Sequence, residues 1–252
     1  MPDWLLPVLA SPFIGSFLGV LIQRLPDGDN VVAARSRCLT CQRTLGPADL
    51  IPIVSYVASR GRCRHCGAPI GRFHLQVELA ALAVAAWAAT VDVNNVDGGL
   101  WLWADCVLGW ALLALAWIDM RHMILPDVLT LPLVVAGLGF AWFMEPERIV
   151  DHAAGAAIGW LLFWTVSRLY RWLRGRDGLG EGDAKLLAAS GAWVTWSGLG
   201  PVMLIAALAG LAQALFVRLR GGEATAATAI PFGPPLAFAT WLVWLYAPLI
   251  GS

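Results

Sequence analysis

Long apolar stretches alternate with short polar segments along almost the whole chain. Several of them approach the ~20 residues that a helix needs to cross a bilayer. The stretch at 184–196 is short, which fits a tilted helix, a partly re-entrant one, or one that extends further than its apolar residues. The pattern predicts an all-α polytopic membrane protein with about eight transmembrane helices. They cover approximately residues 4–25, 74–91, 100–118, 126–143, 150–172, 184–196, 199–217 and 231–250.

The composition supports a membrane protein. Of the 252 residues, 59% are hydrophobic and only 13% are charged, whereas soluble domains are about 25% charged. A chain of 27.0 kDa cannot hide so many apolar side chains in one water-soluble core. The composition therefore excludes a soluble globular domain, a disordered protein and a nucleic-acid-binding protein, and it indicates the lipid bilayer as the chain's environment.

The net charge is zero, with 17 basic and 17 acidic residues, but the basic residues are unevenly distributed. No Lys or Arg precedes Arg24, so the first apolar stretch lacks the basic segment of a signal peptide. We expect a retained helix with its N-terminus outside. This orientation places 16 of the 17 basic residues, Arg35 and Arg176 among them, on the cytoplasmic side, and it leaves only Arg148 outside.

The same orientation divides the chain into three parts. Residues 1–25 form the first transmembrane helix, and the polar, Arg-rich segment 26–73 forms a small cytoplasmic domain. Residues 74–252 form the remaining transmembrane core. In this orientation the polar domain faces the cytoplasm.

Four of the five cysteines lie in that polar segment, as Cys38-Leu-Thr-Cys41 and Cys63-Arg-His-Cys66. The two C-x-x-C pairs are separated by 21 residues, a spacing that suits a zinc-ribbon-like site in which four thiolates surround one structural metal ion. The alternatives are reduced thiols without a metal or a pair of disulfides. A reducing cytoplasm disfavours the disulfides. The zinc would organise the segment rather than take part in chemistry.

Two aspartates lie at predicted membrane boundaries on the cytoplasmic side. Asp119 ends the third apolar stretch, and Asp183 begins the sixth. Ionisable groups at this depth are costly and are candidates for function. Two facing carboxylates can share one proton, so that one activates water while the other polarises a peptide carbonyl, with no fixed assignment of acid and base. The alternative is that each aspartate is a solvated helix cap.

The residues around these aspartates extend the pattern. Gly180 and Gly182 would let an extended substrate approach Asp183 closely, and Lys185 would be a local counter-charge. Asp127 follows Pro126 and fits the N-terminus of a helix, where the helix dipole stabilises a carboxylate.

Together these motifs resemble the type IV prepilin peptidases, bifunctional membrane aspartic peptidases with a GxGD motif. The resemblance extends over nearly the whole chain, and its two catalytic signatures occur in the family's order. The matching segments are Gly15–Val20, Arg24–Pro26, the two C-x-x-C pairs, Ile51-Pro52, Arg60–Cys63, Val77–Leu79, Ile118-Asp119, Leu125–Asp127 and Gly180–Leu187.

The resemblance implies an activity and its site residues. The family removes the leader peptide from prepilins or pseudopilins at the cytoplasmic membrane face, and Asp119 and Asp183 match its catalytic positions. The family also methylates the new N-terminus with S-adenosylmethionine, and Gly61 and Arg62 match a region tied to methyl transfer. The substrate would be a type IV pilin, a competence pseudopilin or a type II secretion pseudopilin. The resemblance also implies that the protein lies in the inner membrane of a bacterium.

The chain departs from the family's pattern at three positions. Gly19 and Leu50 stand where the family usually has Asn, and Leu39 stands where it usually has Pro. None of the three touches the two aspartates, and all lie in or near the segment linked to methylation. One alternative is therefore a peptidase without methyltransferase activity. Alternatives from other classes are a non-enzymatic zinc-ribbon scaffold for pilus or secretion assembly, and a transporter with its acids on a proton path.

Overall fold

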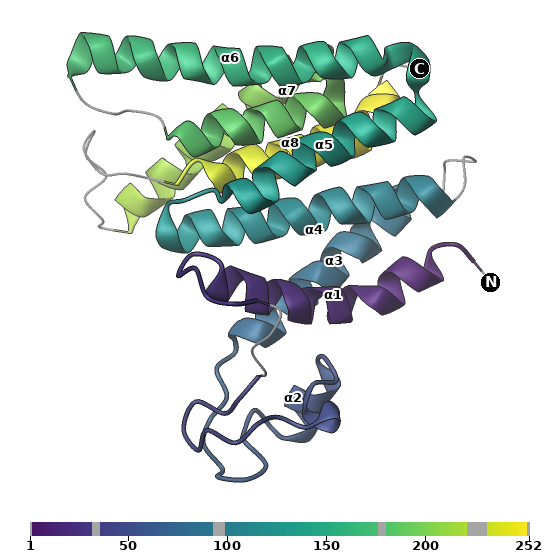
Figure 1. The fold of residues 1–252 in the computed structure, drawn as a ribbon, viewed down its shortest axis with the longest axis vertical. Helices are drawn as coiled ribbons and strands as arrows, with labels where there is room; N and C mark the ends of the chain where they lie inside the picture. Colours follow the sequence, from purple (N-terminus) through teal and green to yellow (C-terminus); the bar gives the residue numbers. More distant parts are fainter. Residues whose placement is uncertain (1, 32–35, 93–98, 176–179, 221–230, 251–252) are drawn as a thin grey trace. The chain divides into compact units, whose positions relative to one another are not determined.

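The computed structural model consists of α-helices joined by turns and by one long irregular segment (Figure 1). It describes residues 2–31, 36–92, 99–175, 180–220 and 231–250. Within these ranges there is no β-strand, only two isolated β-bridges. The prediction of an all-α protein is confirmed for this part of the chain. Its helices are α1 (Leu5–Arg24), η1 (Pro47–Asp49), α2 (Val54–Ala58), α3 (Phe73–Asp92), α4 (Gly99–His122), α5 (Asp127–Met144), η2 (Pro146–Arg148), α6 (Ile149–Arg174), α7 (Glu181–Leu219) and α8 (Gly233–Ile250).

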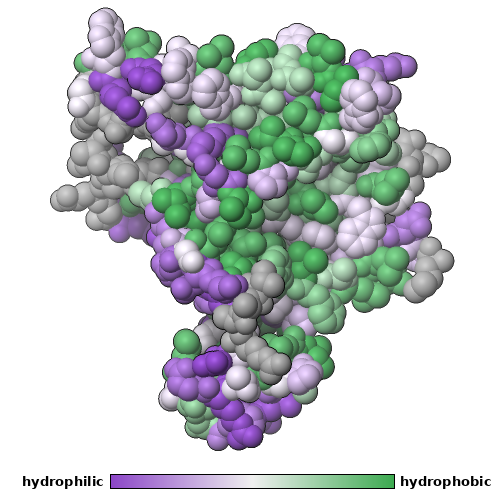
Figure 2. Space-filling view, in the orientation of Figure 1, coloured by the Kyte–Doolittle hydropathy of each residue, from purple (hydrophilic) through white to green (hydrophobic). Residues whose placement is uncertain are grey.

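Six of the described helices are long and apolar enough to cross a membrane. They are α1, α3, α4, α5, α6 and α7, so the chain is a multi-pass membrane protein, although the predicted number of eight spans is not confirmed. Many apolar side chains on these helices face outward, as the space-filling view shows (Figure 2). Phe143 is 82% exposed and Trp172 is 80% exposed, which suits contact with lipid rather than with water.

The chain forms two compact units, Met1–Trp110 and Ala111–Ser252. In the first unit, α1 packs against α3 through small side chains. A Cβ at Gly15 would lie 2.7 Å from the Cα of Glu78, so the two helix backbones come close together. The indole of Trp110 donates a hydrogen bond of 3.0 Å to the carbonyl of Ala81. Glu78 is buried on α3 and accepts a 2.7 Å hydrogen bond from Ile53 N–H, which ties the irregular polar segment to this helix pair.

In the second unit, α7 packs closely against α6. A Cβ added to Gly155 of α6 would lie 2.4 Å from the carbonyl oxygen of Gly191, and one added to Gly159 would lie 2.5 Å from that of Leu187. Real Cβ atoms essentially never come so near to another backbone. Glycine at these positions therefore lets the two helices touch along their backbones.

An aromatic cluster joins α5, α7 and α8 in the same unit. Trp193 stacks on Phe140 and meets Trp244 edge to face, at centroid distances of 5.8 and 5.1 Å. Its indole nitrogen donates a 2.9 Å hydrogen bond to the carbonyl of Leu133, so the buried ring leaves no polar atom unpaired.

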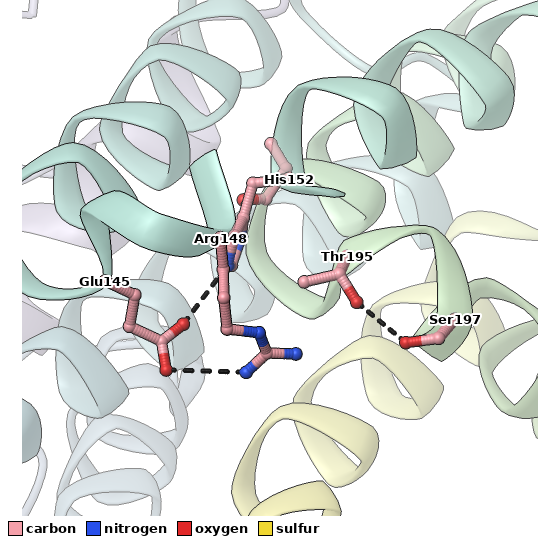
Figure 3. A network of polar contacts seen from close by, with 6 residues as sticks. Glu145, Arg148, His152, Thr195 and Ser197 are labelled. Carbon is pink, nitrogen blue, oxygen red and sulfur yellow. Dashed lines mark hydrogen bonds and ion pairs between the residues drawn. The ribbon is translucent and has the colours of Figure 1, made fainter. Parts of the chain in front are cut away.

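The 39-residue helix α7 is broken at Thr195. This residue has φ 64° and ψ 176°, a conformation that a helix cannot contain and that a β-branched residue rarely adopts. The break falls at the end of the apolar stretch predicted at 184–196, just before the one predicted at 199–217. Element α7 is therefore two helical segments, and the side-chain hydroxyl of Thr195 lies 2.9 Å from that of Ser197 at the break (Figure 3).

A buried histidine holds the chain just before this break (Figure 3). His152 of α6 is 2% exposed; its Nδ1 lies 2.8 Å from the carbonyl oxygen of Ala192, and its Nε2 lies 3.2 Å from the carboxylate of Glu145. Arg148 also reaches Glu145, at 3.5 Å. These contacts attach the α5–α6 turn to the end of the first α7 segment.

The contact between Glu145 and His152 leads to a prediction about the free energy of unfolding. The hydrogen bond from the His152 ring lowers the pKa of the Glu145 carboxyl below its usual value. A lowered folded-state pKa stabilises the fold above the unfolded value of 4.5, and that contribution is lost as the pH falls through the folded-state pKa. We expect Glu145→Gln to lower the free energy of unfolding at pH 7 by about 1 kcal/mol or more. Thermal unfolding in detergent measures this, and the difference from the wild type should shrink below pH 4.5.

Glu147→Gln is the matched control, because Glu147 is exposed on the same turn. It should leave the midpoint of thermal unfolding unchanged both at pH 7 and below pH 4.5. Equal effects of the two substitutions would contradict a specific role for Glu145.

Candidate functional site

Asp119 lies in the last turn of α4, in the second compact unit. The side chains of Met120, Arg121 and His122 are exposed, but Asp119 is only 5% exposed. Its Oδ2 accepts a hydrogen bond of 2.9 Å from the backbone N–H of Gly233 at the start of α8. The helix ends just beyond it, where Met123 takes a positive φ of 54° and its N–H bonds back to the carbonyl of Asp119.

Asp183 lies in the first turn of α7, also in the second unit. Gly180 precedes the helix in an extended conformation, and its carbonyl accepts a hydrogen bond of 3.2 Å from the N–H of Asp183. A helix N-terminus carries unpaired N–H groups and a partial positive charge, which favour a carboxylate in the first turn. The side chain is partly shielded from solvent.

The structure brings these two aspartates together. Their carboxyl groups interact electrostatically, although the two residues are 64 positions apart in the sequence. One stands at the end of a helix and the other at the beginning of a helix. Two carboxyl groups that interact in this way have the chemistry to share one proton.

Two glycines set the space around the pair. A Cβ at Gly182 would lie 2.9 Å from the Cβ of Leu125, so the start of α7 packs directly on the turn before α5. A Cβ at Gly233 would lie 2.6 Å from Oδ2 of Asp119. Gly182 was predicted from its motif, whereas Gly233 was not predicted. The signal that could have found it is Gly233-Pro234-Pro235 at the start of the last apolar stretch, where proline in the first turn is typical of a helix N-terminus.

Lys185 and Asp127 form an ion pair of 2.5 Å between Nζ and Oδ1. Lys185 was predicted to be a counter-charge near Asp183, and in the structure its ion-pair partner is Asp127, the first residue of α5. Asp127 is 56% exposed and Lys185 is 30% exposed. The pair therefore links the first turns of α5 and α7 at the edge of the site and contributes little to stability.

The four cysteines of the polar segment converge in the first unit. Their sulfur atoms lie within 4.8 Å of one another, and those of Cys38 and Cys66 are 3.8 Å apart. All four thiols are free, so the disulfide alternative has no support. Four thiolates at about 2.3 Å from a zinc ion in tetrahedral geometry are about 3.8 Å from one another. The observed cluster fits that geometry.

The two C-x-x-C segments have the same backbone conformation. In each, the residue after the second cysteine takes a positive φ, 58° at Gln42 and 70° at Gly67, and its N–H bonds to the carbonyl of the first cysteine. Each is flanked by one of the two β-bridges, Arg37 to Thr44 and Arg62 to Pro69. Backbone N–H groups of Cys41 and Thr40 directed at the Cys38 sulfur lower the pKa of this thiol to about 6, which favours the thiolate that a metal requires.

Gly61 and Arg62 lie directly before the second of these segments. Gly61 has φ 67°, and a Cβ there would lie 2.9 Å from the hydroxyl of Tyr56. Arg62 forms the β-bridge to Pro69. The first unit also contains an open cleft of about 430 Å³, and neither residue lines it. The lining residues are Phe17, Val20, Val31, Ser36, Leu45, Pro47 and Leu50.

Comparison with known proteins places the chain in a family. Residues 9–91 match the bacterial peptidase A24 N-terminal domain, and residues 106–215 match the type IV leader peptidase family. No solved structure matches the chain.

Several curated proteins are similar over nearly their full length, and each is named prepilin leader peptidase/N-methyltransferase. The protein from Pseudomonas aeruginosa is 35% identical over 96% of this chain and 90% of its own length. The proteins from Burkholderia pseudomallei and Aeromonas hydrophila are 39% and 37% identical, over 89% and 96% of this chain and 79% and 90% of their own lengths. The chain therefore belongs to the type IV leader peptidase family of aspartic peptidases.

Proposed function

We propose that this protein removes the leader peptide from type IV prepilins or pseudopilins and then methylates the new N-terminus. The observation that carries the proposal is the pairing of Asp119 with Asp183 in a chain of this family. A shielded pair of carboxylates at helix ends is the arrangement that activates water for peptide hydrolysis. A scaffold for pilus assembly would have no need of the pair.

The geometry suggests how the pair acts. Two like charges at close range favour a single shared proton over two ionised groups. The ionised carboxylate takes a proton from water as the water oxygen attacks the scissile carbonyl carbon, and the protonated carboxyl donates its proton to the carbonyl oxygen. When the resulting diol collapses, the C–N bond breaks and a proton moves to the departing amine.

The substrate and the topology suit each other. A prepilin has a basic leader in the cytoplasm and an apolar stem in the bilayer, so its scissile bond lies at the interface, where the ends of α4 and α7 carry the two aspartates. We infer eight spans, with α7 contributing two around Thr195 and α8 the last, an external N-terminus and a cytoplasmic site. The distribution of basic residues supports this orientation; Arg35 and Arg176 lie outside the described residues.

The pair of aspartates, Asp119 and Asp183, is called the dyad below, and it leads to the central prediction. We expect Asp119→Asn and Asp183→Asn each to reduce the rate of prepilin peptide cleavage at least about 1,000-fold, because each removes a group that exchanges a proton in the reaction. Cleavage by the purified protein is followed by mass spectrometry. Asp151→Asn is the control, since Asp151 lies in the first turn of α6 and accepts a hydrogen bond of 3.1 Å from the Trp196 indole, away from the pair. Intact processing by both dyad variants would support the scaffold alternative instead.

We propose that the tetra-cysteine cluster binds one structural zinc ion. The cytoplasmic domain predicted at 26–73 contains only one short α-helix and one 3-10 helix among its described residues, so it has little apolar core of its own. A metal that joins its two halves would supply the missing stability. The separation of the cysteines from the aspartates along the chain agrees with a structural role.

The zinc proposal is tested by metal content. The purified protein should contain about one zinc per chain, and Cys38→Ser or Cys63→Ser should abolish it and make the segment sensitive to proteolysis. Cys106→Ala is the control, because Cys106 is buried in α4 and does not belong to the cluster. Zinc content that is unchanged by either cluster substitution would exclude the site.

Methyl transfer is proposed for the polar segment, with S-adenosylmethionine as the donor. The names of the curated relatives support this activity. The residues proposed for it are Gly61 and Arg62, in the turn between α2 and the second cysteine pair. The cofactor would supply an electrophilic methyl group to the new amine, and these residues would help to hold it.

This assignment predicts a separation of the two activities. Gly61→Ala forces a side chain into a positive-φ position against Tyr56, so it should reduce methylation of the product at least about 10-fold and leave cleavage unchanged. The readout is the fraction of cleaved product that gains one methyl group when S-adenosylmethionine is present. Gly71→Ala is the control, since Gly71 has open space around its Cα in the same segment. A wild-type protein that cleaves but never methylates would establish the peptidase-only alternative.

A further inference from the structure

The start of α8 has fewer backbone hydrogen-bond donors than most helix N-termini. The first residues of a helix normally present several unpaired N–H groups, but Pro234 and Pro235 have none. The N–H of Leu236 is already bonded to the carbonyl of Phe232, at 3.1 Å. Gly233 is thus the only residue from 233 to 235 with an N–H, and this N–H is directed at Asp119.

The same position leaves no room for a side chain. A Cβ at residue 233 would lie 2.6 Å from Oδ2, 2.9 Å from Cγ and 3.1 Å from Cβ of Asp119. Any residue other than glycine would push the carboxylate away. The hydrogen bond and the close approach therefore depend on the same feature, the absence of a side chain at Gly233.

A second contact fixes α8 to the helix that carries the other aspartate. The hydroxyl of Thr240 lies 2.6 Å from that of Ser190, and both groups are buried. Ser190 is seven residues after Asp183 on α7, which places the two on the same helix face about two turns apart. Thr240 is also seven residues after Gly233, so α8 contacts Asp119 at its first residue and α7 two turns later.

We propose that Gly233 is a positioning residue of the dyad. Its N–H holds Oδ2 of Asp119 and leaves Oδ1 for the proton exchange with water, while α8 keeps α4 and α7 in register through the Ser190–Thr240 contact. This inference rests on the proposed dyad. It adds a third helix to the active site, which the two aspartate motifs alone do not include.

Two variants test it. Gly233→Ala keeps the N–H but displaces the carboxylate, and a semisynthetic full-length chain with glycolic acid at position 233 replaces the Phe232–Gly233 amide with an ester and adds no side chain. A hydrogen bond to a charged group contributes about 1.5–3 kcal/mol, so each variant should reduce kcat roughly 10- to 150-fold for a prepilin peptide. KM should stay within about threefold, because the change affects the carboxylate rather than substrate binding.

The controls separate positioning from folding. Gly139→Ala adds a Cβ in open space on α5 and should keep kcat and KM. An ester at Ala239 removes an N–H inside α8, so it should lower thermal stability without lowering kcat. If Gly233→Ala fails to fold, the ester variant at position 233 tests the proposal alone. A wild-type kcat in that variant would overturn the proposal. A rise in KM without a fall in kcat would also overturn it.

Asp119→Asn distinguishes this proposal from the dyad itself. If Asp119→Asn remains active, the dyad assignment fails. If it is inactive while both Gly233 variants cleave at the wild-type rate, the dyad stands and only the role of Gly233 is overturned.

Discussion

The hydrogen bond between the Gly233 backbone and the Asp119 carboxylate is the interaction on which the site depends. Its length of 2.9 Å brings the start of the last helix against the end of α4. A carboxylate shielded from solvent at a helix C-terminus faces the unfavourable end of the helix dipole and needs a donor from elsewhere. That donor comes from a backbone group 114 positions further along the chain, so the site forms only when the helices are assembled.

The other aspartate is held by α7, and the position of α7 depends on backbone packing against α6. Lipid tails are as apolar as leucine, so helices in a membrane associate through close van der Waals packing and hydrogen bonds rather than through the hydrophobic effect. The glycine contacts at Gly155, Gly159 and Gly191 provide the packing. The His152 contacts to Ala192 and Glu145 provide the polar part and hold the chain just before Thr195, where α7 breaks.

The polar segment of the first unit is stabilised in another way. It has turns, two β-bridges and a cluster of four thiols. The carboxylate of Glu78 on α3 accepts a hydrogen bond from the N–H of Ile53 in this segment. We propose methyl transfer, which needs a cofactor, for this polar segment, and peptide hydrolysis for the helix ends that carry the two aspartates.

The helical class and the cysteine cluster could be predicted from the sequence, because each depends on local information, and the catalytic role of the two aspartates stays a prediction. Hydrophobic runs longer than a bilayer is thick indicate membrane helices, and C-x-x-C spacing already places two thiols on one side of a turn. The break in α7 is near a boundary that the sequence predicts, since Thr195 lies at the end of the stretch 184–196 and Ser197 lies between it and the next stretch. Gly233 and the Asp127 partner of Lys185 were not predicted, and the number of membrane spans remains a proposal. Contacts between residues 58 or 114 positions apart leave no periodic signal in a single sequence. The sequence by itself determined which groups this protein has, and the tertiary structure decided which of them meet, because helix packing alone brings distant backbone and side-chain groups within hydrogen-bonding distance.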